Sequence, residues 1–191
     1  MSDITYNNKP KEFKIHPKMF LLYLSMASMV MLFSAFSSAL IVKRGDTKHW
    51  IDVHIPIEFL FSTIVIVISS LTIYLAFKNI GAKNFRVFSL ITIALACLFV
   101  FLQVKGWNAL SANGTPYVGN PSGTFVYFIS GIHGVHYIFG IFFLILLDRL
   151  YSGRERVLEY PIYYNILQQF WHFIGLIWVY LYLFFKFIIY N

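Results

Sequence analysis

The sequence predicts an all-α membrane protein, a five-helix transmembrane bundle that forms one domain. Of the 191 residues, 59% are hydrophobic and only 12% are charged, whereas about a quarter are charged in an ordinary soluble domain. Five apolar stretches reach the length of about 20 residues that a helix needs to cross the hydrocarbon core. The loops are too short for a soluble domain, and the internal repeats of many transporters are missing. The predicted spans cover about residues 19–42, 55–77, 87–104, 124–147 and 162–185.

The first two spans begin at clear signals. Residues 19–42 contain no charge and follow Lys18, which ends a polar arm. Residues 55–77 carry Pro56 in their first turn, where proline is suitable because the N–H that it lacks is unpaired there anyway. Glu58 lies about one turn inside this span, close enough to its end for the carboxylate to reach water, and is the only acid within any predicted span.

The other three spans contain no charged residue. Residues 87–104 contain Cys97, the only cysteine, which we interpret as a small core residue. With one cysteine the chain forms no internal disulfide. Residues 124–147 follow the Gly, Pro and Asn-rich segment 108–123, a composition typical of a loop, and residues 162–185 form the last span.

Loop charges predict the orientation, because basic residues are retained on the cytoplasmic side of a membrane. Ten lie on the side of the N-terminus: Lys9, Lys11, Lys14, Lys18, Lys78, Lys83, Arg86, Arg149, Arg154 and Arg156. Five lie on the other side: Lys43, Arg44, Lys48, Lys105 and Lys186. Residues 1–18 are therefore predicted to be a cytoplasmic arm of a bacterial inner-membrane protein, and residues 19–191 its transmembrane domain with a periplasmic C-terminus. The net charge of +7 comes from these loop residues, so no nucleic-acid partner is expected.

Three histidines lie within predicted spans, where polar side chains are costly and raise a functional question. His133 and His136 are three residues apart and project from one helix face. His172 lies in the next, antiparallel span, and at about 1.5 Å rise per residue all three could lie near the midplane. Two interpretations follow. The histidines could supply the axial ligands of a bis-His heme, or they could bond backbone carbonyls and polar groups where helices pack, which we favour.

Other residues within or beside the spans suggest packing roles. Gln103 and Trp107 are four residues apart at the end of the third span, where Trp is commonly an interfacial anchor. Gly131, Gly134 and Gly140 lie along the fourth span, and small residues let helix backbones approach closely. We expect these glycines to lie at helix contacts.

Each span also carries a short sequence element. The last span contains Trp-His-Phe followed by Trp, at Trp171, His172, Phe173 and Trp178. The fourth contains Ser-Gly-x-His-Gly-x-His at Ser130, Gly131, His133, Gly134 and His136. The second contains Ser-Thr and Ser-Ser-x-Thr at Ser62, Thr63, Ser69, Ser70 and Thr72. The third and first contain Gln-x-x-Gly-Trp and Leu-Phe-Ser-Ala-Phe, at Gln103, Gly106, Trp107 and residues 32–36. In this order, across nearly the whole chain, the elements resemble subunit III of the heme-copper cytochrome oxidases, in its five-helix bacterial form.

Two positions depart from the family pattern. An acid that relatives often carry in the first span falls near Met29, and the Asp that follows Trp-His-Phe-Val is Gly175. The roles of those acids are therefore not expected here. Longer family members have two further N-terminal helices that help to form a lipid-filled cleft, so one wall of that cleft is expected to be missing.

The resemblance implies a subunit that acts by contact and carries no redox centre, catalytic residue or metal. It implies that the hemes and copper belong to the partner subunits, and that subunit III packs against subunit I with bound phospholipid. The implied setting is an aerobic respiratory electron transport chain coupled to proton translocation. Expected partners are oxidase subunits I and II, membrane lipids and a respiratory supercomplex. Two alternatives stay open: a small bis-His membrane cytochrome, and an accessory subunit of a quinol oxidase or nitric oxide reductase.

Overall fold

The computed structural model describes residues 16–46, 53–79, 83–115, 119, 121–150 and 161–189, and all regular structure in this part is helical. The helices are α1 (Pro17–Asp46), α2 (Ile57–Lys78), α3 (Lys83–Ala112), α4 (Pro121–Leu150) and α6 (Pro161–Phe184), which continues as the π-helix η1 (Phe185–Ile189). Five helices in the described residues are long and apolar enough to cross a membrane, which confirms the predicted fold class. Most of the predicted cytoplasmic arm, residues 1–15, lies outside the described residues.

Proline begins four of the helices. Pro17, Pro121 and Pro161 are first residues, and Pro56 is the N-cap of α2. Each suits its place because its φ is already helical and its missing N–H would have no partner in the first turn. Glu58 lies in the first turn of α2, where a negative charge is favourable to the helix dipole.

Three helices, α1, α3 and α4, are longer than the apolar stretches that predicted them, whereas α2 and α6 have about the predicted length. Each of the three has 30 residues and continues into polar sequence at its ends. As a result, α4 includes Asp148, which is only 8% exposed. Glu58 stays the only acid within the predicted spans, but the helix and its burial both continue past the point where hydropathy falls and so include Asp148.

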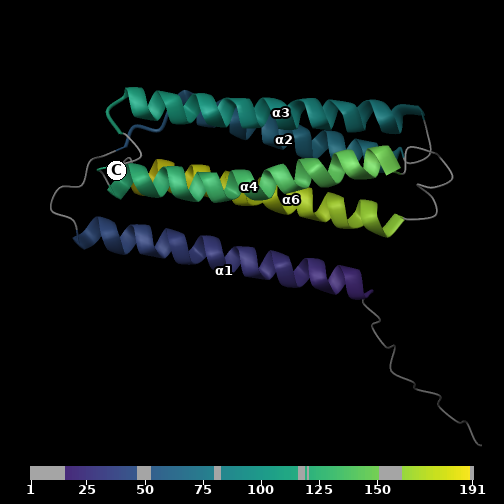
Figure 1. Cartoon of the computed structure of the whole chain (residues 1–191), viewed down its shortest axis with the longest axis horizontal. Coiled ribbons are helices and arrows are strands. Elements are labelled where there is room, and N and C mark those ends of the chain that lie inside the picture. Colours follow the sequence, from purple (N-terminus) through teal and green to yellow (C-terminus); the bar gives the residue numbers. More distant parts are fainter. Residues whose placement is uncertain are drawn as a thin grey trace, which may run out of the picture.

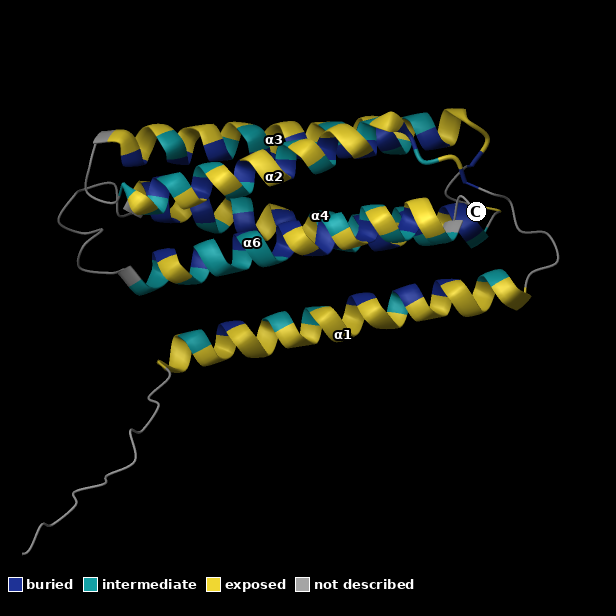
Figure 2. Cartoon of the chain, turned by 180° about the vertical axis from the view of Figure 1, so that it is seen from behind, coloured by how far each residue is buried: buried dark blue, intermediate teal, exposed yellow. Residues whose placement is uncertain are grey.

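Four helices form a closed four-helix body, and α1 lies outside it. In the body, α2 contacts α3 and α6, and α4 contacts the same two helices, whereas α1 contacts α4 and α6. Figures 1 and 2 show α1 along one edge, next to α4 and α6 and away from α2 and α3. We call the end of the bundle where α2 begins and α6 ends the Lys186 end, and the opposite end the Lys18 end.

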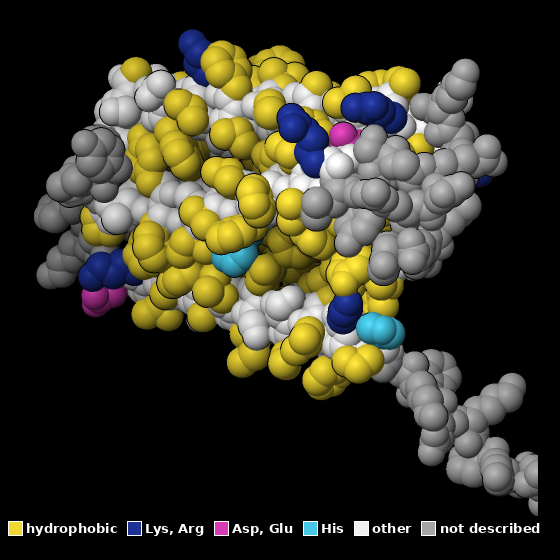
Figure 3. Space-filling model, turned by 45° about the vertical axis from the view of Figure 1, so that its right-hand side comes forward, with side chains coloured by type: hydrophobic (Ala, Val, Ile, Leu, Met, Phe, Trp, Pro, Cys, Tyr) yellow, Lys and Arg dark blue, Asp and Glu magenta, His cyan; other side chains and the backbone are white. Residues whose placement is uncertain are grey.

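The core of the body is aromatic, and the outside of the bundle is apolar. The largest fully buried side chains are Trp171, Trp178, Tyr137, Tyr164, Phe59 and Phe99. Figure 2 shows exposed residues along the outer faces of the helices. Many of these are large hydrophobic residues, among them Met31, 73% exposed, and Leu176, 68% exposed. In Figure 3 hydrophobic side chains dominate the middle of the visible face and Lys and Arg lie mostly toward its ends, as lipid and headgroups require. Cys97 is exposed on the surface, so its interpretation as a core residue is wrong.

Candidate functional site

The hydroxyl groups of α2 bind side chains from the two helices that pack on it. Ser62 accepts a hydrogen bond from Gln103 Nε2 of α3 at 3.0 Å. Thr72 shares a hydrogen bond of 2.8 Å with Thr92, which also lies in α3. Ser62 Oγ also donates to the carbonyl of Phe59 in its own helix, at 2.9 Å. A hydroxyl can donate and accept at once, so these side chains join helices in lipid without breaking helical hydrogen bonds.

Two tryptophans of α6 use the same face of α2. Trp178 Nε1 donates to Thr63 Oγ1 and Trp171 Nε1 donates to Ser69 Oγ, each at 3.1 Å. Both indoles are fully buried, so each N–H needs a partner within the protein. We call these two hydrogen bonds the α2–α6 indole contact. The two tryptophans are seven residues apart on α6, which is about two helical turns. Their partners on the antiparallel α2, Thr63 and Ser69, are six residues apart, so the two spacings nearly match.

The third-span element joins α3 to two helices. Besides the bond from Gln103 to α2, Trp107 Nε1 donates to Ser130 Oγ of α4 at 3.0 Å. Tyr127 of α4 returns a hydrogen bond of 3.0 Å from its hydroxyl to the carbonyl of Trp107. Trp107 is half-buried and bonded at the Lys186 end, so it anchors α4 in addition to any contact with the membrane boundary.

His133 is completely buried among four aromatic rings. Its ring centroid lies 5.1 Å from that of Trp178, 6.1 Å from Phe99, 6.2 Å from Phe33 and 6.3 Å from Tyr137. Neither ring nitrogen has a hydrogen-bond partner among the described residues. These rings come from α6, α3, α1 and α4 and occupy the space that a heme bound at His133 would need. The geometry therefore argues against the bis-His heme at this residue.

The other two histidines bond within their own helices. His136 Nδ1 lies 2.8 Å from the carbonyl of Ile132, and His172 Nε2 lies 3.5 Å from Gln168 Nε2, each partner four residues earlier. The expected hydrogen bonds across helix contacts are therefore not made by these two side chains. Within the described part of the chain, no three His, Cys, Asp or Glu side chains are placed to hold a metal ion.

Gly131 and Gly134 do not mark a close helix approach. A Cβ built on either residue meets no atom of the described chain within 4 Å, so the expectation for these two glycines is wrong. At Gly140 the expectation is confirmed, since a Cβ there would lie 3.2 Å from the Phe170 ring and 3.5 Å from Trp171. Phe173, the remaining member of the last-span element, is half-buried and packs against the hydrophobic core.

Two other glycines, Gly106 and Gly175, lie at tight helix contacts. A Cβ at Gly106 would lie 2.8 Å from the ring of Phe59, and a Cβ at Gly175 would lie 3.2 Å from Ser70 Oγ. Ser70 therefore occupies the space that a larger side chain at position 175, such as the Asp of the resembled family pattern, would enter. The sequence singled out both positions, Gly106 as a member of an element and Gly175 as a departure from one, but only the packing against α2 shows what they contact.

Basic residues attach the ends of α1 to α6 and η1. Lys18 Nζ donates a hydrogen bond to the hydroxyl of Tyr163 and lies 4.3 Å from the centre of that ring. At the other end, Arg44 Nη1 donates to the carbonyl of Ile188 in η1. Met29, at the position of the absent family acid, is half-buried against the core.

The chain is similar to known proteins along nearly its whole length. The family model for cytochrome c oxidase subunit III matches residues 8–190. The cytochrome c oxidase subunit 3 of Bacillus sp. (strain PS3) is 26% identical over 130 residues, which cover 66% of this chain and 62% of that protein. The subunit 3 of Thermostichus vulcanus is 25% identical over 166 residues, covering 80% and 78%. That of Paracentrotus lividus is 28% identical over 126 residues, covering 64% and 47%.

The matched part thus spans 62% of the Bacillus relative and about half of the Paracentrotus relative. The family match includes all five helices and every element described above. The chain belongs to the cytochrome c oxidase subunit III family.

Proposed function

We propose that this chain is the non-redox subunit III of an aerobic respiratory heme-copper terminal oxidase in a bacterial inner membrane. In this role it packs against subunit I and supports oxygen reduction coupled to proton translocation. The hemes and copper belong to oxidase subunits I and II, and this chain contributes packing surface and bound phospholipid. The proposal rests on the family match over residues 8–190 and extends it to the whole complex.

The proposal is supported mainly by one observation: the side chains of the family elements hold the helices of this chain together. Trp171 and Trp178 bind hydroxyls of α2 through the α2–α6 indole contact, and Gln103 and Trp107 bind α2 and α4. These side chains are occupied in holding helices together. A bundle organised in this way supports a neighbouring subunit by keeping its shape, which is a function by contact.

Purification through a tag on this chain in mild detergent tests the proposal. We expect heme- and copper-containing chains to co-purify and the preparation to consume oxygen with an electron donor. Both reduced cytochrome c and quinol need to be supplied, because the donor is bound by other subunits. Recovery with the subunits of a nitric oxide reductase, or with no heme protein, would contradict the proposal.

Histidine variants separate this role from that of a cytochrome. His133→Ala, His136→Ala and His172→Ala are expected to leave the heme content per subunit I unchanged, because none of the three binds heme in the proposed role. His133→Ala removes a ring that packs against rings of four helices, so we expect easier loss of the chain in detergent and lower sustained turnover. His136→Ala and His172→Ala, whose hydrogen bonds stay within their own helices, should show the same effect more weakly. A heme absorbance band in this chain purified alone, lost in His172→Ala, would support the bis-His cytochrome instead.

The proposed orientation places the Lys18 end in the cytoplasm and the Lys186 end in the periplasm. Asn84 and Asn113 are exposed residues near opposite ends of α3 and form a matched pair for labelling. In a Cys97→Ala background, Asn113→Cys should react with an impermeant thiol reagent added to intact spheroplasts, and Asn84→Cys should react only after lysis. The opposite result would reverse the orientation.

A further inference from the structure

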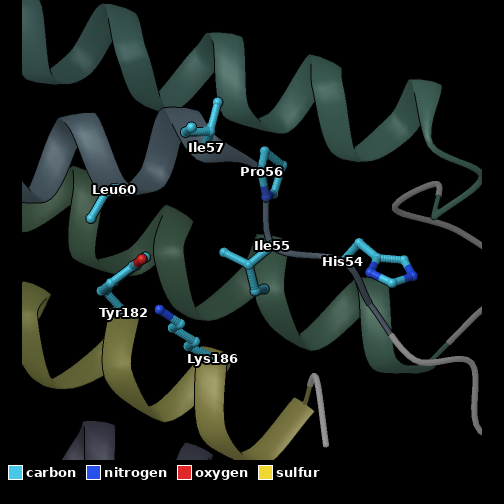
Figure 4. A pocket seen from close by; sticks show the side chains of 7 residues that line it. All are labelled: His54, Ile55, Pro56, Ile57, Leu60, Tyr182 and Lys186. Atoms are coloured by element: carbon cyan, nitrogen blue, oxygen red, sulfur yellow. The ribbon is translucent and has the colours of Figure 1, made fainter.

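A pocket of about 400 Å³ opens at the Lys186 end between the start of α2 and the end of α6. Figure 4 shows the side chains that line it: His54, Ile55, Pro56, Ile57, Leu60, Tyr182 and Lys186. The polar groups come from both sides, His54 from the segment before α2 and the other two from α6 and η1. Tyr182 and Lys186 are four residues apart, and Figure 4 shows the Lys186 amine directed toward the Tyr182 hydroxyl.

Lys186 brings a positive charge to the pocket. Among the described residues, no carboxylate forms an ion pair with it. Of the nearby acids, Asp46 lies 3.6 Å from Lys43, and Glu58 is not among the lining residues although it follows Ile57. Arg44 binds the carbonyl of Ile188 and so adds a second cation beside η1.

The pocket changes character along the membrane normal. Lys186, Tyr182 and His54 supply polar atoms at the end of the bundle, where lipid headgroups lie. Below them Ile57 is 62% exposed and Leu60 is 40% exposed, so an apolar surface leads from the pocket along α2. A basic pocket between transmembrane helices that is continuous with an apolar surface fits the headgroup and acyl chain of an anionic phospholipid.

The start of α2 borders the pocket through Pro56 and Ile57. Its N-cap, Pro56, makes no side-chain hydrogen bond to the first turn, but Glu58 in that turn already complements the positive end of the helix dipole. The preference of the pocket for an anion therefore comes from Lys186 and not from the helix terminus.

We propose that this pocket binds the phosphate of an anionic phospholipid, with Lys186 as the ion-pair partner and the Tyr182 hydroxyl as a hydrogen-bond donor. One acyl chain lies along Ile57 and Leu60. The inference deepens the lipid-binding part of the proposed function by assigning a lipid class and its ligands. It depends on the transmembrane placement of α2 and α6 and holds for any complex the chain joins.

The test counts lipids retained by the full chain and its co-purifying subunits. The complex is incorporated into bilayers of phosphatidylcholine mixed with phosphatidylglycerol and extracted again in mild detergent, and the bound lipids are counted by native mass spectrometry. The wild type should retain phosphatidylglycerol in preference to phosphatidylcholine. Lys186→Ala should lower this preference about fivefold, which corresponds to about 1 kcal/mol per basic residue at a lipid surface.

Matched variants keep the result specific. Lys186→Arg should keep the preference, and Tyr182→Phe should lower it about threefold, as one hydrogen bond in a membrane predicts. Lys105→Ala removes the same charge from an exposed position near the same end, where the ammonium lies 5.6 Å from the Phe101 ring centre, and should change nothing. An unchanged preference in Lys186→Ala, or an equal loss in Lys105→Ala, would overturn the proposal.

In a further experiment, inorganic phosphate is added during extraction, and we expect the bound lipid to stay in place. Complete displacement by phosphate would show a site for a soluble anion and reject the lipid. Co-purification of heme protein is recorded in the same samples. If the lipid result holds and no heme protein is recovered, the proposed function fails while the lipid site stands.

Discussion

The four-helix body and α1 are held by different means, although both lie in the same lipid. The body has a fully buried aromatic core and hydrogen bonds that cross between its helices. Of the 30 residues of α1, four are buried: Leu22, Phe33, Ser37 and Leu40. Lipid chains are as apolar as leucine, so burial alone does not hold a helix against its neighbours, and specific contacts have to do so.

The contacts of α1 lie at three depths. Lys18 and Arg44 attach its ends to α6 and η1. In the middle, Phe33 contacts His133 and His136, and Phe36 lies 5.1 Å from Phe128 of α4. The body therefore keeps its shape through its interior, and α1 is positioned by a few side chains whose removal should affect α1 alone.

The largest effect is expected in the body, from Trp178→Ala. This change leaves a cavity beside Phe59 and Phe99 and leaves the Thr63 hydroxyl without its donor. Truncation of a buried aromatic side chain costs about 3 to 5 kcal/mol of unfolding free energy. Reversible unfolding in mixed micelles, followed by circular dichroism, measures the loss. Leu176→Ala, on the lipid-exposed side of α6, is the control, and an equal loss there would remove the distinction between core and surface.

Phe33→Ala also truncates a buried aromatic side chain, but its effect should be confined to the position of α1. Phe33 is 2% exposed and connects α1 to the body through His133. Spin labels at Ser38→Cys and Leu183→Cys, in a Cys97→Ala background, report the separation of α1 from α6. We expect a broader distance distribution with unfolding of the body unchanged. Met31→Ala, at a 73% exposed position, should keep the narrow distribution.

Glycine substitutions compare a tight contact with an open one. Gly106→Ala places a methyl group 2.8 Å from the ring of Phe59, which is itself 1% exposed and unable to withdraw. Overpacking of this kind typically costs about 1 to 3 kcal/mol. Gly134→Ala meets no described atom within 4 Å and should be neutral or slightly stabilising, because alanine favours the helix. Unfolding in mixed micelles measures both, and destabilisation by Gly134→Ala would reveal a contact outside this chain.

The smallest effects are expected at the ends of α1. Lys18→Met and Arg44→Gln each remove one hydrogen bond to α6 or η1, worth about 0.6 kcal/mol in a membrane protein. The two sites are on the order of 40 Å apart along the helix, so their effects should add. The spin-label distances at Ser38 and Leu183 measure both changes. A double variant whose effect far exceeds that sum would show that the ends of α1 act together.

Several parts of the site could be predicted from the sequence and several could not. The family elements contained Trp171, Trp178, Gln103 and Trp107 as well as the hydroxyl residues that they bind. The elements did not show which residues pair, because a hydrogen bond between helices depends on how those helices face each other. The hydrogen bonds of His136 and His172 were misjudged for the same reason. Asp148 was missed because hydropathy declines before the helix and its burial end.

The sequence by itself determined the five transmembrane helices and the family. An apolar segment in lipid has to form a helix long enough to cross the bilayer, so hydropathy is enough to predict the spans. The family elements can be recognised from their order along the chain, without knowledge of the fold. Only the tertiary structure decided that α1 stands outside a closed four-helix body, that Gly106 and Gly175 mark tight contacts while Gly131 and Gly134 do not, and that Lys186 shares a pocket with His54. Each of these depends on which faces of distant segments meet, and the nearly uniform apolar character of the spans leaves that choice to side-chain shape and a few hydrogen bonds.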